Sequence, residues 1–273
     1  MSVVTLSRQL GSLGTEMAQS LAKILGYEYV DKETIGKALM DYGLPEFDVE
    51  RFDEKKPPLW DSLQIQRRKF LHLIQAVIYD FARRGKVVIV GRGGQVLLKD
   101  LSGVLHIRVM APLEIRLLRI REDQGLDEKQ AIRILRRNDR DSAGFIRSFF
   151  DVDWADPDLY DLVISTRKIS VERGVDLMLG FVRSFDFQAG RKKDEEKLAD
   201  LALVQKVEAA LLGILGIDVR HVNIQVEAGE VTLRGAVGSQ EDKDHCRRAV
   251  SDIQEVKRVN NQLLVTQYTR FSG

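Results

Sequence analysis

Short apolar runs alternate with amphipathic stretches through the first two thirds of the chain, and this alternation most constrains the fold. The run VVIV at 87–90 is uninterrupted and β-branched, which is typical of a parallel strand buried on both faces. Further strands are predicted at 3–6, 27–30, 104–109 and 161–164, with helices near 14–25, from 32, at 61–84, 113–123, 127–150 and 171–185. Such alternation predicts a parallel sheet covered by helices on both sides, with ligands at the carboxyl ends of its strands.

A different pattern begins near residue 197. A helix is predicted at 198–215, two strands at 221–227 and 230–234 around Ala228-Gly229, a helix at 239–253 and a strand at 256–265. This α-β-β-α-β order carries its own apolar faces and predicts a separate small α+β domain. We expect domains at 1–187 and 197–268, joined by the charged run 188–196, which is a linker or a helix start. The Pro- and charge-rich stretch 42–58 is predicted to be an excursion from the first domain.

Composition excludes several classes of function. The formal net charge of +1 gives no overall attraction to nucleic acid, so no nucleic-acid partner is expected. Cys246 is the only cysteine of the chain, which rules out an intrachain disulfide and a Cys-rich metal site and fits a reducing compartment. The N-terminal residues lack the basic flank and long apolar run of a signal peptide, so a cytoplasmic protein is predicted.

Three separated segments resemble the cytidylate-kinase-like branch of the P-loop kinases. They are the GSxG loop with YVDKETI at 29–35, VVIVGRGG at 87–94 and DVDWADPDLYDLVIST at 151–166, within a likeness that covers 2–187. The resemblance implies a P-loop kinase-type sheet, ATP and Mg²⁺ as cofactors, and phosphoryl transfer to a CMP-like acceptor. No metal site of the chain's own is predicted.

The C-terminal part, from 197 to 267, resembles a BON domain. The matching segments are VNIQVEAGEVTLRGAV at 222–237 and VKRVNNQLLV at 256–265. Gly235 stands where BON sequences place a glycine, whereas Glu255 replaces the glycine they often carry before the last strand. This resemblance leaves a membrane or a protein open as a partner of the C-terminal domain. The sequence gives no oligomeric state.

The loop after the first strand is the candidate phosphate site. A P-loop binds phosphate through consecutive backbone N–H groups and the positive end of a helix, assisted by a Lys and by a Ser or Thr that holds Mg²⁺. Here Gly14 stands in the Lys position, Glu16 in the Ser/Thr position and Leu13 in place of a usual glycine. The resembling branch itself lacks that Lys and usually has an Arg at the next position, which is Thr15 in this chain. We expect phosphate contacts from Arg8, Gly11, Ser12, Gly14 and Thr15; the alternative is a plain strand–loop–helix turn.

Two residues are candidates for the acceptor side. Arg92 follows a buried strand inside a Gly-rich turn, where an Arg can bind a monophosphate bidentately. The alternative is an ion pair with a nearby carboxylate. Asp31 follows the second strand and either contacts the acceptor or caps the helix that begins at Lys32.

Several arginines recur at helical spacing in the segment 133–147. Kinases of the resembling class carry phosphate-binding arginines on a lid helix, where they neutralise the transferred group and help exclude water. Arg140 and Arg147 are the predicted catalytic residues. The alternative is a solvated helix face paired with Asp139 and Asp141.

Two functions of the kinase-like domain are therefore predicted, beside an assembly or membrane-associated role carried by the BON-like domain. The first is ATP-dependent phosphoryl transfer to a nucleoside monophosphate. The second is a catalytically inactive domain that senses a nucleotide or another phosphate-bearing small molecule and acts through the BON-like domain.

Overall fold

The computed structural model describes residues 2–41, 64–185, 191–212 and 222–266. These residues divide into two compact units. The first contains β1–β5 with α1, α2 and α5–α8, and the second contains α4, α9, α10 and β6–β8.

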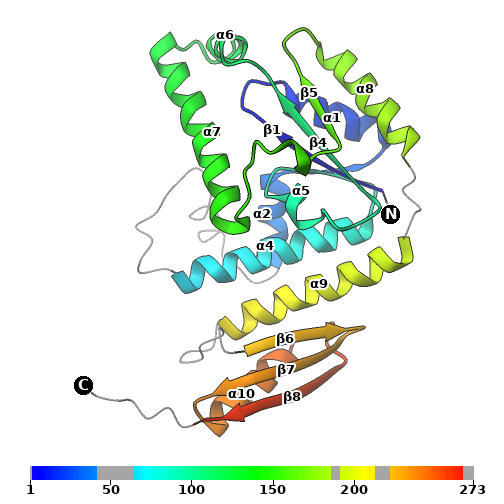
Figure 1. Ribbon diagram of the computed structural model, residues 1–273, viewed down its shortest axis with the longest axis vertical. Coiled ribbons are helices and arrows are strands. Elements are labelled where there is room, and N and C mark those ends of the chain that lie inside the picture. Colours follow the sequence, from blue (N-terminus) through cyan, green and yellow to red (C-terminus); the bar gives the residue numbers. More distant parts are fainter. Residues whose placement is uncertain (1, 42–63, 186–190, 213–221, 267–273) are drawn as a thin grey trace. The chain divides into compact units, whose positions relative to one another are not determined.

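The first unit is built on a five-stranded sheet (Figure 1). Its strands are β1 (Val3–Arg8), β2 (Glu28–Val30), β3 (Val87–Val90), β4 (Val104–Met110) and β5 (Leu162–Ser165), in the order β2-β3-β1-β4-β5. Every neighbouring pair runs parallel. The carboxyl ends of all five strands therefore meet at one edge, with β1 in the centre.

One face of this sheet is covered by α1 (Gly14–Leu25) and α8 (Val171–Ser184) (Figure 1). Val4 and Leu6 belong to the same buried cluster as Met17 and Met178 of these helices. Because successive side chains of a strand point to opposite faces, Arg8 lies on the same face as Leu6, beside the start of α1.

The opposite face carries α5 (Gly94–Leu97) and the segment around the short 3₁₀ helix Pro157–Leu159. A Cβ at Gly94 would lie 3.3 Å from the Thr5 side chain, so α5 packs directly on β1. The unit is completed by α2 (Lys32–Asp41), α6 (Leu113–Gln124) and α7 (Glu128–Phe150). Asp127 begins α7 with a capping box that it shares with Gln130.

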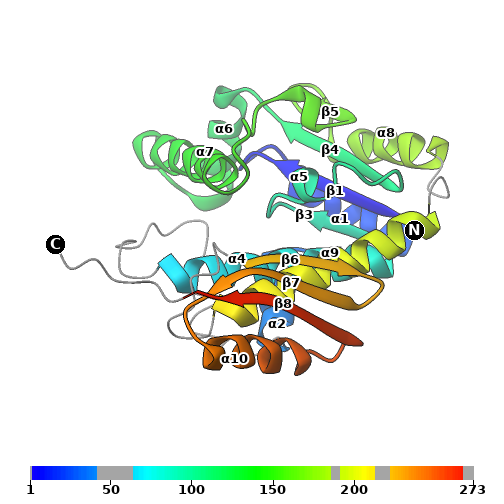
Figure 2. The same cartoon turned by 60° about the horizontal axis from the view of Figure 1, so that its bottom comes forward.

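The second unit has a three-stranded mixed sheet (Figure 2). It consists of β6 (Val222–Glu227), β7 (Glu230–Val237) and β8 (Arg258–Val265), in the order β6-β7-β8. The hairpin β6–β7 is antiparallel, and β7–β8 is parallel. The helices α9 (Arg191–Leu212) and α10 (Gln240–Ser251) share one buried cluster with these strands, in which Val207 of α9 and Cys246 of α10 join Leu233 of β7.

The helix α4 (Gln64–Arg84) groups with this second unit, although it precedes β3 in the sequence. His72 lies 2.6 Å from the carboxylate of Glu208 on α9, and Lys206 of α9 lies 3.0 Å from that of Asp80. Burial, with a smaller effect of Glu208, raises the pKa of Tyr79 on α4 to about 12, so this phenol stays neutral. The domain limits 1–187 and 197–268 remain a prediction, because the sequence likeness and the compact units assign α4 differently.

The predicted fold class is confirmed: a parallel sheet with helices on both faces, followed by a small α-β-β-α-β unit. Differences are local. The charged run forms the start of α9 from Arg191, and β7 continues through Gly235 to Val237. The predicted excursion at 42–58 lies outside the described residues. In the part of the chain that is described, no helix has the length and hydropathy needed to cross a membrane.

Candidate functional site

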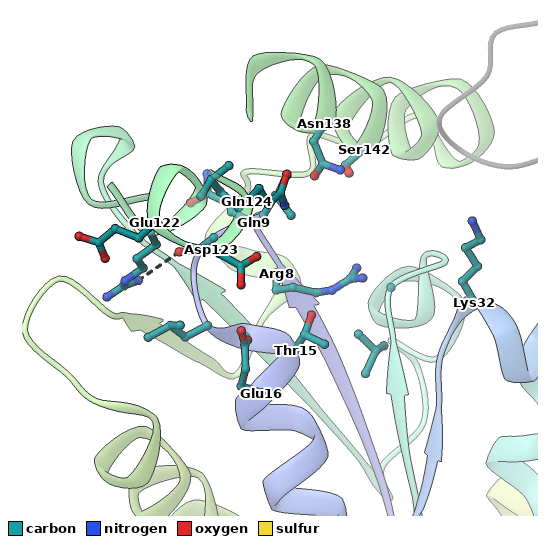
Figure 3. A pocket seen from close by; sticks show the side chains of 18 of the residues that line it. Arg8, Gln9, Thr15, Glu16, Lys32, Glu122, Asp123, Gln124, Asn138 and Ser142 are labelled. Atoms are coloured by element: carbon teal, nitrogen blue, oxygen red, sulfur yellow. Dashed lines mark hydrogen bonds between the residues drawn. The ribbon is translucent and has the colours of Figure 1, made fainter. Parts of the chain in front are cut away.

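A pocket of about 600 Å³ opens at the carboxyl edge of the parallel sheet, in the first unit. Figure 3 shows it between the end of β1, the start of α1 and the helix α7. Its volume falls within the range of small-molecule sites. The lining side chains that carry charge are Arg8, Lys32, Arg92, Arg119, Glu16, Glu122 and Asp123.

The loop between β1 and α1 forms the floor of this pocket. Gly11 has a φ of 75° and Leu13 a φ of 63°, so both are in the left-handed region that a tight turn requires. Leu13 is the N-cap of α1 and supplies no side-chain hydrogen bond. The N–H groups of the first helical turn, Gly14 to Glu16, therefore keep their capacity to bind an anion.

Gly14 has no room for any side chain. A Cβ at this position would lie 2.5 Å from the Cβ of Arg8 and 3.0 Å from that of Val109. The side chain of Arg8 begins beside Gly14 and extends to the turn after β3, where its Nη1 would lie 3.1 Å from a Cβ at Gly91. Figure 3 shows this side chain pointing into the space between the loop and Lys32. Arg8 thus brings a cation to the start of α1 from the end of β1.

The turn after β3 forms the second wall. Arg92 is in the left-handed region, with a φ of 55°, and only 7% of its surface is exposed. Gly93 follows with a φ of 75°, and a Cβ there would lie 2.4 Å from the ring of Phe150 at the end of α7. The glycine thus allows α7 to approach the turn, and Arg92 lines the pocket from inside the protein.

A smaller cavity of about 20 Å³, room for about one water molecule, adjoins the pocket and shares Arg8, Arg92 and Ser142 with it. The amide of Gln95 lines this cavity and is 3% exposed. An amide offers one group that donates and one that accepts, so Gln95 is suited to a polar ligand group.

Contacts with the sheet hold the segment 154–160, which contains Trp154, Asp156 and Tyr160. The guanidinium of Arg108 on β4 lies 4.5 Å from the ring centre of Trp154 and 5.2 Å from that of Tyr160, and it donates to the carbonyl oxygen of Trp154. The indole of Trp154 donates to the hydroxyl of Ser7 over 2.8 Å, and Asp156 caps the following 3₁₀ turn. These contacts hold the side chains of Trp154 and Tyr160 against β1 and β4.

Most of the predicted ligand residues line the same pocket. They are Arg8, Gly11, Gly14 and Thr15 of the predicted phosphate set, with the predicted acceptor residue Arg92. Ser12 does not line it: this residue is fully buried, and its hydroxyl donates to the carbonyl of Gln9 over 2.7 Å. Whether the lining residues bind phosphate stays a prediction.

Asp31 caps α2, which was one of its two interpretations. Its Oδ1 accepts from the backbone N–H groups of Glu33 and Thr34 at 3.1 and 3.0 Å. The adjacent Lys32 lines the pocket instead. The sequence signal that could have predicted Lys32 as a lining residue is its place directly after a strand and a helix-capping Asp31.

Arg140 and Arg147 are exposed and do not line the pocket. The residues of α7 that do are Asn138 and Ser142, which stand one turn apart above the loop (Figure 3). At 100° per residue, Arg140 lies on the far side of the helix from both. Arg137 pairs with Asp141 at 3.6 Å, as expected for a solvated face. The catalytic role of Arg140 and Arg147 remains a prediction.

Arg119 is a lining residue that the sequence did not single out. Its Nη1 donates to the carbonyl of Gly11 over 3.1 Å, and its Nη2 donates to that of Thr166 over 2.8 Å. In the sequence, Arg119 is one of several charged residues of α6, and its spacing does not distinguish it from them. Only the fold shows that its side chain contacts the loop.

The carboxylates near the loop decide whether this domain could hold a Mg²⁺ ion. Among the described residues, no group of three His, Cys, Asp or Glu side chains is placed to hold a metal ion. A nucleotide-bound Mg²⁺ needs fewer, because phosphates, waters and one or two carboxylates complete its shell. Glu16 and Asp123 line the pocket and could supply these one or two carboxylate ligands.

The chain has a parallel sheet, a loop at its carboxyl edge that leads into a helix N-terminus, and a pocket beside it lined by four basic and three acidic side chains. This arrangement is that of a P-loop kinase-type domain. The family comparison agrees. The chain belongs to the cytidylate kinase-like family, whose model matches residues 3–168, and residues 199–267 match the BON domain.

The relatives are distant. The chain is 28% identical over 169 residues to the cytidylate kinase of Methanopyrus kandleri, covering 62% of this chain and 86% of that one. It is 24% identical over 197 residues to the cytidylate kinase of Pyrococcus horikoshii, covering 71% and 96%. Among solved structures, an uncharacterised protein from Eubacterium ventriosum aligns with a TM-score of 0.55 and 20% identity over 67% of this chain and 99% of that chain. This last likeness concerns the fold.

Proposed function

We propose that the kinase-like domain binds a nucleoside triphosphate at the loop after β1 and transfers its terminal phosphoryl group to a nucleoside monophosphate. The family membership supports this, together with a pocket that gathers four basic side chains beside the N-terminus of α1. Phosphoryl transfer depends on positioning and charge neutralisation rather than on covalent chemistry by the protein, so such a pocket is chemically sufficient.

The position of Arg8 carries the proposal. A P-loop lysine would stand at Gly14, where a Cβ would lie 2.5 Å from the Cβ of Arg8. Its guanidinium lies between the start of α1 and the turn that holds Arg92, hence between the proposed donor and acceptor sides. A cation at this place would neutralise the charge of the phosphoryl group that is transferred, which is the role of the P-loop lysine in other kinases.

The residues present fit Mg²⁺ and ATP. Thr15 offers a hydroxyl and Glu16 a carboxylate at the start of α1, and Asp123 offers a second carboxylate from α6. When bound, the ion would neutralise phosphate charge. The residues of this chain would hold the nucleotide through Arg8, Arg119 and the N–H groups of the first turn.

The acceptor is proposed to bind on the opposite side, against Arg92 and Lys32, with its base toward Gln95. An amide pairs with a donor and an acceptor that stand side by side, as on the edge of a CMP-like base. The cavity at Gln95 has room for about one water molecule, so the base would enter only when Phe145 of α7 moves aside. Arg140 and Arg147 would also need a movement of α7 to reach the phosphates, and we propose that role for them only in a closed state.

A second candidate is nucleotide sensing without turnover. The pocket face of α7 is neutral, with Asn138 and Ser142, and Glu16 adds negative charge where a phosphate is proposed to bind. In that case the nucleotide signal would act through the BON domain on a membrane or protein partner.

The test is ADP release in a coupled assay with ATP·Mg²⁺, with and without CMP or UMP. Release that depends on the acceptor, and falls at least about tenfold in Arg8→Gln, supports the kinase function. Arg183→Gln is the matched control, because this arginine is exposed on α8 and does not line the pocket. Calorimetric binding of ATP without release would identify a sensor, and no binding would refute both.

A further inference from the structure

Three consecutive carbonyl groups of the phosphate loop are held by donors from other elements. The carbonyl of Leu10 accepts from Arg116 Nη1 over 3.3 Å, and that of Gly11 accepts from Arg119 Nη1 over 3.1 Å. The carbonyl of Ser12 accepts from the hydroxyl of Thr166 over 2.9 Å. The loop is therefore held from α6 and from the end of β5.

Fixing these carbonyls also fixes the donors of the loop. In a trans peptide the C=O and the following N–H point in opposite directions, so the N–H groups of Gly11, Ser12 and Leu13 are oriented at the same time. That of Ser12 donates to the carbonyl of Gln9 over 3.2 Å. The remaining two, with the first turn of α1, form the set available to an anion.

Arg116 connects this loop to α7. Its side chain is only 5% exposed and pairs bidentately with Asp139, at 2.9 Å for Nη1 and 2.8 Å for Nη2. Its Nε donates to the carbonyl of Ala111 over 3.1 Å. One guanidinium thus joins the loop, the residue after β4 and a helix that supplies Asn138 to the pocket.

We propose that Arg116 and Asp139 are positioning residues that make the shape of the phosphate loop depend on the place of α7. With Asp139 in contact, the Arg116 charge is neutralised and its Nη1 stays directed at Leu10. When α7 moves away, the buried guanidinium loses its counter-ion and reorients, because an unpaired buried charge is strongly unfavourable. The loop then loses the first of its three anchors.

The inference rests on the proposed function for its ligand, since the loop is taken to hold nucleotide phosphates. Its consequence is reciprocal: nucleotide bound at the loop should steady α7, and a perturbed α7 should weaken nucleotide binding by the same factor. Asp139 itself does not line the pocket, so its substitution removes no direct contact with the nucleotide, and we expect its effect on binding to pass through Arg116.

The test compares Asp139→Asn with Asp141→Asn, which removes a carboxylate that pairs with Arg137 on the same helix. Hydrogen exchange of the nucleotide-free protein should accelerate at residues 9–14 in Asp139→Asn only. Calorimetry should show a loss of ATP·Mg²⁺ affinity of about tenfold, or 1.4 kcal/mol. Asp139→Glu, which keeps the carboxylate, should restore most of the wild-type exchange protection at residues 9–14 and most of the affinity for ATP·Mg²⁺.

Unchanged exchange at residues 9–14 in Asp139→Asn would overturn the inference, as would equal effects of Asp139→Asn and Asp141→Asn. Uniformly faster exchange throughout the unit would also overturn it, because it would show general destabilisation. If the wild-type protein binds no nucleotide while loop exchange still responds to Asp139→Asn, the coupling stands and the proposed function fails.

Discussion

Gly14→Ala is the smallest change that tests how Arg8 takes the place of a P-loop lysine. The added methyl carbon would stand 2.5 Å from the Cβ of Arg8, which is closer than such atoms approach, and 3.0 Å from that of Val109. Both are Cβ atoms, whose positions the backbones of β1 and β4 set, so the start of α1 has to shift away from Arg8. Overpacking of this kind costs about 1–3 kcal/mol. Replacing glycine by alanine in a helix returns up to about 1 kcal/mol.

The net destabilisation should therefore be about 1 kcal/mol, or about 2–4 °C in Tm. The loss of nucleotide binding should be larger, because a charge-assisted hydrogen bond contributes about 1.5–3 kcal/mol. That corresponds to about 10- to 150-fold in affinity for ATP·Mg²⁺ by calorimetry.

Gly180→Ala is the control, since nothing lies within 4 Å of a Cβ at this exposed position in α8. It should leave affinity unchanged and raise stability by up to about 1 kcal/mol. Gly14→Ala protein that is folded and binds ATP·Mg²⁺ like the wild type would refute the assigned place of Arg8. Gly14→Lys should also fail to improve binding, although it recreates the usual P-loop residue.

Three further predictions concern single side chains. Gln95→Leu removes the amide proposed to pair with the acceptor base, so calorimetry should show CMP affinity weakened about tenfold and ATP·Mg²⁺ affinity unchanged, whereas an equal loss for both ligands would contradict the placing of the base. Burial lowers the pKa of His106 below its ordinary 6.5, against smaller opposing effects of Asp161 and a backbone hydrogen bond, so the folded state binds fewer protons than the unfolded state. Stability should therefore fall as the pH drops below about 6.5, and urea unfolding of His106→Gln should show a smaller fall. Burial, with a smaller effect of Asp242, raises the pKa of the Cys246 thiol to about 11, so a thiol reagent at pH ~8 should label it only as fast as the second unit opens.

Sequence patterns predicted the elements of the fold well because they are set by local chemistry. The four β-branched residues at 87–90 can be buried on both faces only as an inner strand, and they form β3, next to the central β1. The helix predicted at 14–25 is α1, and Gly26 ends it with a φ of 64°, a conformation that glycine adopts without strain. Ile24, which shares that helical spacing, is nevertheless 54% exposed, because the covered stripe of α1 is narrower than its apolar sequence.

The site was harder to predict because it depends on directions that sequence spacing does not contain. Arg8 and Gly14 could be named from the loop, but only the structure shows that the Cβ of Arg8 lies directly against Gly14. Arg116 and Arg119 look like any charged helix surface in the sequence, yet Arg116 is buried and both donate to loop carbonyls. A stripe of arginines on α7 was the stronger pattern, and Arg140 within it faces away from the pocket.

In the second unit, the order of the elements could be predicted from the sequence, but the elements that pack together could not. Its αββαβ order followed from the sequence, since its strands alternate and Ser239 caps its second helix. The membership of α4 did not, because the pairing of His72 with Glu208 joins distant parts of the chain and leaves no local signal.

The central claim is that Arg8 supplies the phosphate-binding charge at the start of α1. The most direct measurement is calorimetric titration of ATP·Mg²⁺ into the wild-type protein, Arg8→Gln and Arg183→Gln at one fixed salt concentration. We predict binding by the wild type and by Arg183→Gln, and affinity at least about tenfold weaker in Arg8→Gln, in line with the loss of one charge-assisted contact. Equal affinity of all three proteins, or no binding by any of them, would contradict the claim.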